Sequence, residues 1–253
     1  MRVHLCQLDL AWHDRPANHA AARRMLENAR PAAGDLVVLP EMFPVGFSMD
    51  VDAIADHAGE TARFVPQLAK DFGVYVIAGN VIKPDDRGRN EALVAGPDGS
   101  LLTTFHKLHP FRFAGEDHHY TGGDGVKIFD WNGLKVSPLI CYDLRFPEAF
   151  RLATKAGAEM LVVIANWPTA RVSHWLALLT ARAIENQAYV VGVNRVGNDP
   201  KNAYPGRSVT IDPRGNTRLD AGDAVGCFPC DIEPQTVREY RANFPALADI
   251  RLI

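Results

Sequence analysis

A strand, a cysteine and a helix follow one another in the stretch Val136-Ser137-Pro138-Leu139-Ile140-Cys141-Tyr142-Asp143-Leu144-Arg145-Phe146-Pro147-Glu148. The apolar run ends at Cys141 and Pro147 opens a helix, so the cysteine lies at a strand-to-helix turn. Such a turn projects its side chain from the open end of an α/β sheet, where sites form, and helix N–H groups there favour a thiolate. A cysteine can also serve as a small buried hydrophobe, but the charges around this one weigh against packing alone. We expect Asp143 and Arg145 to pair with each other and shape the turn.

Strand and helix patterns alternate along the rest of the chain. Apolar segments predict strands at residues 3–8, 36–39, 74–78, 134–140, 160–164 and 189–194. Helical patterns cover residues 16–29, 61–72, 147–155 and 171–186. Hairpin turns are predicted at Gly96-Pro97-Asp98-Gly99, Trp131-Asn132-Gly133 and Asp212-Pro213-Arg214-Gly215. The pattern therefore predicts an α/β layered fold with mixed sheets, and the similar hairpins in the two halves indicate weak internal symmetry.

Size and charge narrow the class of protein. The chain has 253 residues, of which 47% are hydrophobic and 23% charged, so we expect residues 1–253 to form one domain. The net charge of -3 is scattered, which gives nucleic-acid binding no electrostatic support. The longest apolar run is far shorter than the roughly 20 residues of a membrane span, and no signal peptide is evident. We expect a cytoplasmic protein with no membrane partner and reduced cysteines. The last helix, from about residue 234, is predicted to pack as an arm against the domain or a partner subunit.

Two other predicted strands end in charged residues. Glu41 follows the run Leu36-Val37-Val38-Leu39-Pro40, where burial would raise its pKa towards that of a general base. Lys107 follows the run Leu101-Leu102-Thr103-Thr104-Phe105-His106 and supplies an ammonium. A cysteine nucleophile needs a proton acceptor and a group that stabilises the oxyanion formed on a carbonyl carbon. Each feature alone is weak, and the three together predict a cysteine hydrolase.

These segments resemble a known family. Leu39-Pro40-Glu41-Met42-Phe43, His106-Lys107-Leu108-His109 and the Cys141 stretch are similar to the Glu, Lys and Cys motifs of the nitrilase superfamily of carbon-nitrogen hydrolases. Glu116, in Phe113-Ala114-Gly115-Glu116-Asp117, resembles a second glutamate of that family. Ala165-Asn166-Trp167-Pro168, His174-Trp175 and residues 181–190 resemble its ω-amidase-like branch. The resemblance implies an α-β-β-α sandwich of two mixed sheets flanked by helices, a homodimer, and catalysis without metal or organic cofactor.

The resemblance also implies roles for individual residues. Glu41 would act as base, Cys141 as nucleophile, and Lys107 with the backbone N–H of Tyr142 would hold the oxyanion, while Glu116 orients Lys107. The substrate would be a small carboxamide, such as the ω-amide of a 2-oxo dicarboxylic acid. Five further residues have open assignments: Phe43 and Trp167 either wall the cavity or belong to the core, and a substrate carboxylate could meet Arg112, Arg171 or His174.

Other sequence patterns favour different functions but give weaker support. Cys227-Phe228-Pro229-Cys230 has the spacing of a redox motif but lies in a strand-like segment, which favours a structural role. The histidines 106, 109, 118 and 119 lack metal-ligand spacing and are interpreted as loop residues near the entrance. No phosphate-binding loop is present, which argues against ATP-dependent chemistry. The alternatives are the same fold acting on a nitrile, an N-carbamoyl amine or another acyl acceptor, a non-enzymatic binding protein, and a hydrolase using His109 or His174 as base.

Overall fold

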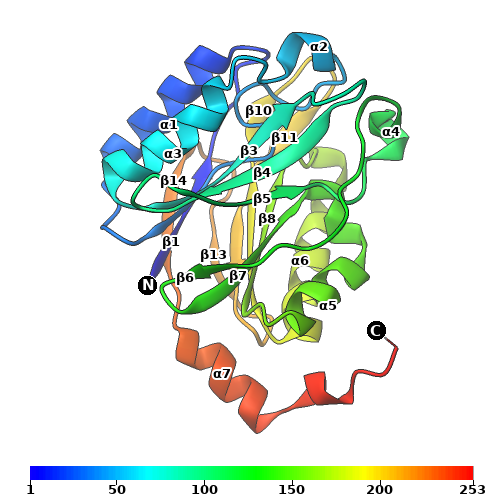
Figure 1. Cartoon of the computed structure of the whole chain (residues 1–253). Coiled ribbons are helices and arrows are strands. Elements are labelled where there is room, and N and C mark those ends of the chain that lie inside the picture. Colours follow the sequence, from blue (N-terminus) through cyan, green and yellow to red (C-terminus); the bar gives the residue numbers. More distant parts are fainter. Residues whose placement is uncertain (253) are drawn as a thin grey trace.

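Two mixed β-sheets stack face to face in the computed structural model, which describes residues 1–252 (Figure 1). The first sheet contains, in spatial order, β14 (Gly226–Asp231), β1 (Arg2–Gln7), β2 (Leu36–Val38), β3 (Tyr75–Ile82), β4 (Arg89–Ala95) and β5 (Leu101–His106). The second contains β13 (Thr217–Asp220), β12 (Val209–Ile211), β9 (Tyr189–Asn194), β8 (Met160–Ala165), β7 (Leu134–Ile140) and β6 (Phe129–Trp131). A small ribbon pairs β10 (Val196–Asn198) with β11 (Ala203–Pro205).

The two sheets share one topology. In the first, the parallel strands β1, β2 and β3 are bordered by antiparallel β14 on one side and by the antiparallel hairpin β4–β5 on the other. In the second, parallel β7, β8 and β9 are bordered by β6 and by the β12–β13 hairpin in the same way. The mixed sheets and the internal symmetry predicted from the hairpins are therefore confirmed.

Helices cover the outer faces of both sheets. α1 (Arg15–Ala29) and α3 (Glu60–Phe72) lie on the first sheet, whereas α5 (Pro147–Lys155) and α6 (Val172–Asn186) lie on the second (Figure 1). Pro16 occupies the first turn of α1, where its missing N–H costs nothing, and the Asp14 side chain caps that helix by accepting from the N–H of Ala17. The α-β-β-α sandwich is thus confirmed. No helix in the described part of the chain is long and apolar enough to cross a membrane.

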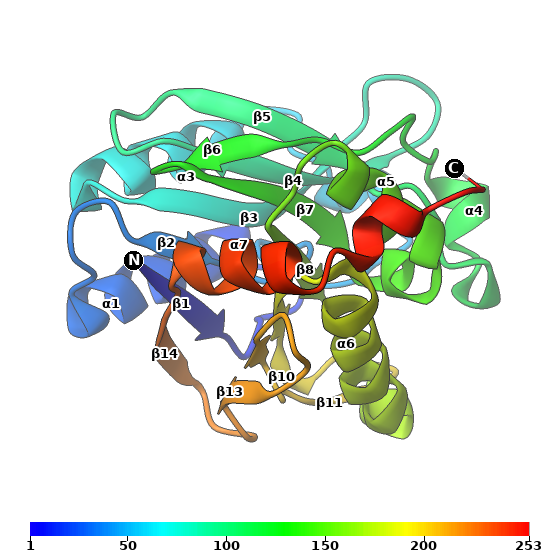
Figure 2. The ribbon, with the colours of Figure 1, turned by 90° about the horizontal axis from the view of Figure 1, so that it is seen from below.

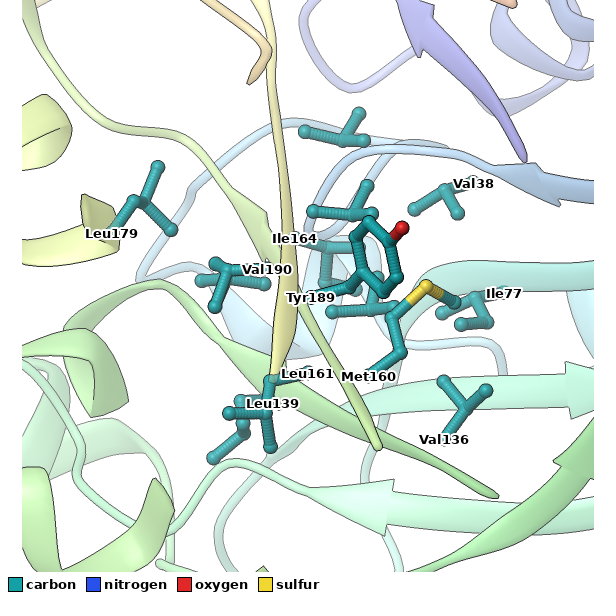
Figure 3. Close-up of a cluster of buried hydrophobic side chains, with 14 of the residues drawn as sticks. Val38, Ile77, Val136, Leu139, Met160, Leu161, Ile164, Leu179, Tyr189 and Val190 are labelled. Carbon is teal, nitrogen blue, oxygen red and sulfur yellow. The ribbon is translucent and has the colours of Figure 1, made fainter. Parts of the chain in front are cut away.

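The core between the sheets follows the two-residue period of the strands. Val38 and Ile77 of the first sheet face Met160 and Tyr189 of the second (Figure 3). The intervening positions of the first sheet, such as Val37, point the other way and pack beneath α1 and α3. Full burial of one such aliphatic side chain contributes about 1.5–3 kcal/mol, so both faces of the first sheet stabilise the fold.

A tight turn and the last helix complete the sandwich. Asn132 and Gly133 have φ values of +48° and +86°, the left-handed pair that a two-residue hairpin turn between β6 and β7 requires. α7 (Pro234–Asn243) lies across one end of the sandwich (Figure 2). Arg238 pairs with Glu159 at 2.7 Å, and Arg241 donates hydrogen bonds to backbone carbonyls at the C-terminus of α6. The predicted arm therefore packs against its own domain. Two short helices, α2 (Val51–Ile54) and α4 (Glu116–His119), were not predicted.

Candidate active site

Four strand ends bring polar side chains to one edge of the two sheets. Cys141 directly follows β7, Lys107 follows β5, Asn166 follows β8, and Glu41 comes shortly after β2. β5 runs in the same direction as β2 because two antiparallel pairings separate it from β3. Carboxyl ends of strands with one direction meet at one edge, which is where ligand sites form in α/β sheets. The strand-end prediction therefore brings Glu41, Lys107 and Cys141 to one place.

Glu41 is fully buried and held on both oxygens. Its Oε1 accepts hydrogen bonds from Asn90 Nδ2 at 2.8 Å and Lys107 Nζ at 2.9 Å. Its Oε2 accepts from the backbone N–H of Asn166 at 2.8 Å. Burial raises the pKa of Glu41, but the Lys107 charge and these hydrogen bonds outweigh burial and lower that pKa. The sequence expectation of a raised pKa is therefore wrong, and Glu41 is an ionised carboxylate at neutral pH.

A glycine makes room for the segment that carries Glu41. Gly79 lies in β3, and a Cβ atom at this position would come within 2.2 Å of the Met42 backbone nitrogen and 2.6 Å of the Pro40 carbonyl oxygen. Heavy atoms do not approach so closely, so only glycine fits unless the backbone shifts. The backbone of Met42 adds a left-handed φ of +43°. Close packing of two backbones thus fixes where the Glu41 carboxylate lies.

Lys107 is a buried cation between two carboxylates. Its Nζ lies 2.9 Å from Glu41 Oε1 and 2.8 Å from Glu116 Oε2. Burial lowers the pKa of Lys107, but the charges of Glu116 and Glu41 raise it well above its usual value. The ammonium also lies 5.2 Å from the centre of the Phe47 ring. Lys107 therefore remains charged and is fixed in position by its partners.

Glu116, the first residue of α4, joins the same network. It accepts hydrogen bonds from the backbone N–H of Phe111 and from Asn90 Nδ2, which donates to Glu41 as well. Burial and the neighbouring Glu41 charge raise the pKa of Glu116, while Lys107 opposes this shift. Glu116 therefore lies in contact with Lys107, the residue that it is predicted to orient.

Cys141 has a left-handed backbone, with φ of +46°, and the residue is 9% exposed. A non-glycine residue in this region costs about 1–3 kcal/mol and is found mainly at functional sites. Burial raises the pKa of Cys141 well above the usual range, and the Glu41 charge raises it further, although Lys107 opposes this. These two effects oppose the preference for a thiolate that a helix N-terminus would give, and Cys141 opens only the short turn η2 (Cys141–Arg145). The resting group is a thiol.

Asp143 connects the cysteine turn to the lysine segment. Its carboxylate accepts hydrogen bonds from the Ile140 N–H at 3.1 Å and from the His109 N–H and Nδ1 at 2.9 and 2.8 Å. Arg145 turns elsewhere, with its guanidinium 5.0 Å from the Trp167 ring centre. The predicted pair between Asp143 and Arg145 is therefore wrong, because the partners of Asp143 come from the loop after β5.

The histidines of that loop have other partners. His109 is held by Asp143 and stacks on Phe146 at 3.8 Å, and His106 lies 3.5 Å from Glu91. Within residues 1–252, no group of three or more His, Cys, Asp or Glu side chains is arranged to hold a metal ion. The charges that act most strongly on Cys141 are those of Glu41, Lys107 and Glu116, not of a histidine.

A cavity of about 370 Å³ opens onto the Cys141 side chain. Its lining consists of Phe47, Lys107, Phe111, Phe113, Ala114, Cys141, Tyr142, Arg145, Asn166, Trp167, Pro168, Arg171, Lys201, Asn202 and Tyr204. It therefore combines an apolar wall with a polar end that holds the thiol, the ammonium and an amide. Trp167, Tyr142 and Arg171 were predicted near the substrate and line this cavity.

Three predicted substrate contacts lie elsewhere. Phe43 is fully buried in the core beneath α1 and α3, where its ring is tilted against His19, so its assignment as a cavity wall is corrected to core. Arg112 pairs with Asp117 and its side chain is 87% exposed. His174 lies 3.3 Å from Arg145 without lining the cavity. Of the three proposed cations, only Arg171 lies at the cavity.

Sequence reasoning missed several residues of the site. Asn166 follows β8 directly, so the argument that found Glu41 and Lys107 would have found it too. Asn90 lies inside β4 and is buried. A polar residue within an apolar strand was the one sequence feature that could have indicated it. Nothing in the sequence marks Phe47, because it reaches Lys107 from a loop of irregular structure.

Comparison with known proteins places the chain in a family. The model of the carbon-nitrogen hydrolase family matches residues 2–242. A protein named omega-amidase YafV from Yersinia enterocolitica is 37% identical over 98% of this chain and 96% of that protein. A 2-oxoglutaramate amidase from Bacillus subtilis is 35% identical over 97% of this chain and 95% of its own length. Among solved structures, XC1258 from Xanthomonas campestris, a CN-hydrolase superfamily protein with an arsenic adduct in its active site, is 34% identical with a TM-score of 0.93 and covers 100% of this chain and 98% of that one.

Fold, site and relatives together define the class as a hydrolase that acts on carbon–nitrogen bonds other than peptide bonds. The chain belongs to the carbon-nitrogen hydrolase family, within the nitrilase superfamily. The family resemblance inferred from the Glu, Lys and Cys motifs is therefore confirmed.

Proposed function

We propose that this protein is an amidase that cleaves a small carboxamide to a carboxylic acid and ammonia, with Cys141 as nucleophile. We further propose that the substrate is the ω-amide of a 2-oxo dicarboxylic acid, such as 2-oxoglutaramate. The single observation that carries the proposal is that the Cys141 thiol and the Lys107 ammonium line one cavity of about 370 Å³, with the buried Glu41 carboxylate acting on both. Relatives named omega-amidase and 2-oxoglutaramate amidase support the substrate class.

The first half of the reaction forms a thioester. Glu41 takes the proton of the Cys141 thiol while the sulfur attacks the amide carbon, and the carbonyl oxygen becomes an oxyanion. Lys107 Nζ and the backbone N–H of Tyr142 stabilise this oxyanion. Protonated Glu41 then donates its proton to the amide nitrogen, the carbon–nitrogen bond breaks, and ammonia leaves. The raised pKa of Cys141 and the lowered pKa of Glu41 support this starting point, because they give a resting thiol beside a base.

The second half releases the acid. Glu41, again a carboxylate, takes a proton from water as the water oxygen attacks the thioester carbon. The carbon–sulfur bond then breaks, the proton on Glu41 returns to the Cys141 sulfur, and the carboxylic acid departs. One water is consumed for each amide, and the enzyme returns to its starting protonation state.

Glu116 and Asn90 position the reacting groups. Asn90 Nδ2 bridges the carboxylates of Glu41 and Glu116, and Glu116 holds the second side of Lys107. Hydrogen bonds between buried charged and polar groups hold these side chains in a fixed geometry. We propose that Glu116 orients the Lys107 ammonium, whereas Glu41 acts as the base.

Cations at the cavity support a substrate with a distal carboxylate. Arg145, Arg171 and Lys201 all line it, whereas Phe47, Phe111 and Trp167 supply apolar surface. The Arg171 guanidinium lies 5.5 Å from the Phe111 ring centre, and a planar guanidinium can bind a carboxylate with two parallel hydrogen bonds. A short linear substrate with an amide at one end and a carboxylate at the other matches this distribution of charge.

We also propose that the protein forms a homodimer and works in the cytoplasm. The apolar side chains of Leu152 on α5 and Ile184 on α6 are half exposed on the outer face of the second sheet, which suits a subunit contact. All four cysteines are free, which suits a reducing compartment. Light scattering of the purified protein and fractionation of cells test these two points.

The decisive experiment measures ammonia release from 2-oxoglutaramate, 2-oxosuccinamate, a neutral short amide, a nitrile and an N-carbamoyl amine. We expect the two 2-oxo acid amides to be hydrolysed with the highest kcat/KM, and Cys141→Ala to abolish turnover while leaving the fold intact. Preference for the nitrile or the carbamoyl compound would replace the proposed substrate class. Unchanged ammonia release by Cys141→Ala would overturn the mechanism, and no ammonia release from any of these compounds would favour a binding protein.

A further inference from the structure

Two thiols other than Cys141 lie on the outer face of the first sheet. The inner face of that sheet packs against the second sheet. Cys6 of β1 and Cys227 of β14 are direct partners in the antiparallel pairing, and their Sγ atoms are 3.5 Å apart. Both side chains belong to the face beneath α1. These two thiols have no part in the mechanism proposed above, and they lie outside the lining of its cavity.

Cys227 is paired with Cys6 rather than with its sequence neighbour. Cys230 follows Cys227 by three positions, and side chains three apart on a strand point to opposite faces. Accordingly, Cys230 packs into the core between the sheets, whereas Cys227 packs on the helix side. The spacing that resembles a redox motif is therefore not a pair in space, and the sequence contains no signal for the Cys6 contact.

A buried histidine and aspartate accompany Cys227. His4 Nδ1 lies 3.8 Å from Cys227 Sγ, and its Nε2 lies 2.8 Å from Asp35 Oδ2. The aspartate therefore fixes the imidazole orientation and stabilises its protonated form, as in triads that activate a nucleophile. His4 and Asp35 are both buried.

The two sulfurs differ in protonation. Hydrogen bonds from Cys6 and His4 outweigh burial and lower the pKa of Cys227 to about 6, and the His4 charge adds to this. The pKa of Cys6 is raised well above the usual range by its contact with Cys227 and by burial. At neutral pH one sulfur is a thiolate and the other a thiol that donates to it. This is the division that a reactive and a resolving cysteine require.

Cys227 is also reachable from solvent. It is half-buried and lines a hollow of about 500 Å³ between α1 and the segment that leads into β14. Arg24 and Asn28 of α1 supply polar groups to this hollow, and Met25 supplies apolar surface. A small oxidant can therefore meet the Cys227 sulfur without entering the cavity at Cys141.

We propose that Cys227 is a modification site, a peroxide-reactive thiolate whose sulfenic acid is resolved by Cys6 into a disulfide between β1 and β14. In the first step the Cys227 sulfur attacks one oxygen of a hydroperoxide, the O–O bond breaks, and the released oxygen leaves as water or an alcohol after taking up a proton. In the second step the Cys6 sulfur, losing its proton, attacks the Cys227 sulfur and hydroxide leaves as water. Two thiols are oxidised by two electrons and one hydroperoxide is reduced.

The strands allow this bond. Opposite residues in an antiparallel pair have Cα atoms about 4.5–5.5 Å apart, which lies within the range of disulfides, about 4.4–6.8 Å. β14 is an edge strand that pairs only with β1, so it can shift slightly as the disulfide forms. The bond would tie this edge, which leads directly into α7, to the interior of the sheet.

The test treats the Cys141→Ala protein with one equivalent of hydrogen peroxide, so that the active-site thiol does not report. We expect the intact mass to fall by two hydrogens, with peptide mapping locating the bond at Cys6–Cys227. Cys6→Ser in the same background should instead leave a sulfenic acid on Cys227 that dimedone traps. Cys230→Ser is the matched control and should form the bond at the original rate.

Further variants separate activation from structure. His4→Gln should slow the oxidation roughly tenfold and lower the thiolate absorbance at neutral pH, and both effects are measured on the folded protein. A bond between Cys227 and Cys230, or oxidation of Cys227 no faster than that of Cys230, would overturn the proposal. Because Cys141 is absent, these outcomes are independent of the proposed amidase activity.

Discussion

The Lys107 ammonium lies 2.9 Å from Oε1 of Glu41, and the two side chains are sealed from solvent. Glu116 holds the same ammonium from its other side. One cation therefore serves two buried carboxylates, and removing Lys107 would leave both without a counterion. The groups that we propose for the chemistry are also structural partners, so mutations here should affect both activity and stability.

Replacing Lys107 by Met should abolish turnover and destabilise the protein by about 3–5 kcal/mol, because two buried carboxylates lose their counterion. Urea unfolding followed by circular dichroism measures the change. Lys70→Met is the matched control, since Lys70 is exposed on α3 and its loss should stay within about 0.5 kcal/mol. Equal stability of the two variants would show that the Lys107 contacts contribute little.

Replacing Glu41 by Gln should lower kcat but increase the ionised fraction of the Cys141 thiol. Without the base, kcat should fall by roughly 10²–10⁴. The negative charge of Glu41 raises the pKa of Cys141, so its removal should lower that pKa and increase the thiolate absorbance at a given pH. Absorbance is measured against Cys141→Ala to remove the signal of the other thiols. If the thiolate decreased instead, Glu41 would not be the charge that keeps Cys141 protonated.

The strand ends could be predicted from sequence, whereas the contacts between distant loops could not. Glu41, Lys107 and Cys141 each follow an apolar run, and the placement of a strand end is a local property of the chain. Phe43 was misplaced because the left-handed backbone at Met42 is not marked by its residue type. Besides the nearby Ile140 N–H, Asp143 accepts from backbone N–H groups 34 and 35 positions away in the loop after β5, a distance that no local pattern encodes.

Gly79→Ala tests whether backbone packing fixes the base. The added methyl carbon would meet the Met42 nitrogen at 2.2 Å, so the segment that carries Glu41 must move. We expect kcat to fall by roughly a hundredfold, since a shift near 1 Å in a reacting group has effects of that size. Gly125→Ala is the control, because its Cβ would meet nothing within 4 Å. Full activity of Gly79→Ala would mean that the Glu41 position tolerates backbone movement.

Asn166 should tune the acid side of the pH profile. Its side chain and its N–H both donate to Glu41, and a hydrogen bond to a charged group contributes about 1.5–3 kcal/mol, so Asn166→Ala should lower kcat/KM roughly ten- to a hundredfold. Asn166→Asp places a second carboxylate there, which raises the pKa of Glu41. Because Glu41 must be ionised to act as base, activity should then be lost at a higher pH as the solution is acidified. If the acid limb of the kcat/KM profile were unchanged, the ionisation of Glu41 would not be the cause of that limb.

Arg171→Ala should distinguish recognition of a distal carboxylate from catalysis. If Arg171 receives that carboxylate, its loss removes a charged hydrogen bond of about 1.5–3 kcal/mol, and KM for 2-oxoglutaramate should rise roughly ten- to a hundredfold. A neutral short amide makes no such contact, so its kcat/KM should be unchanged. Arg112→Ala is the control, since that side chain points away from the cavity and pairs with Asp117. Equal losses on the charged and the neutral amide would mean that Arg171 supports the cavity wall through Phe111 rather than binding the carboxylate.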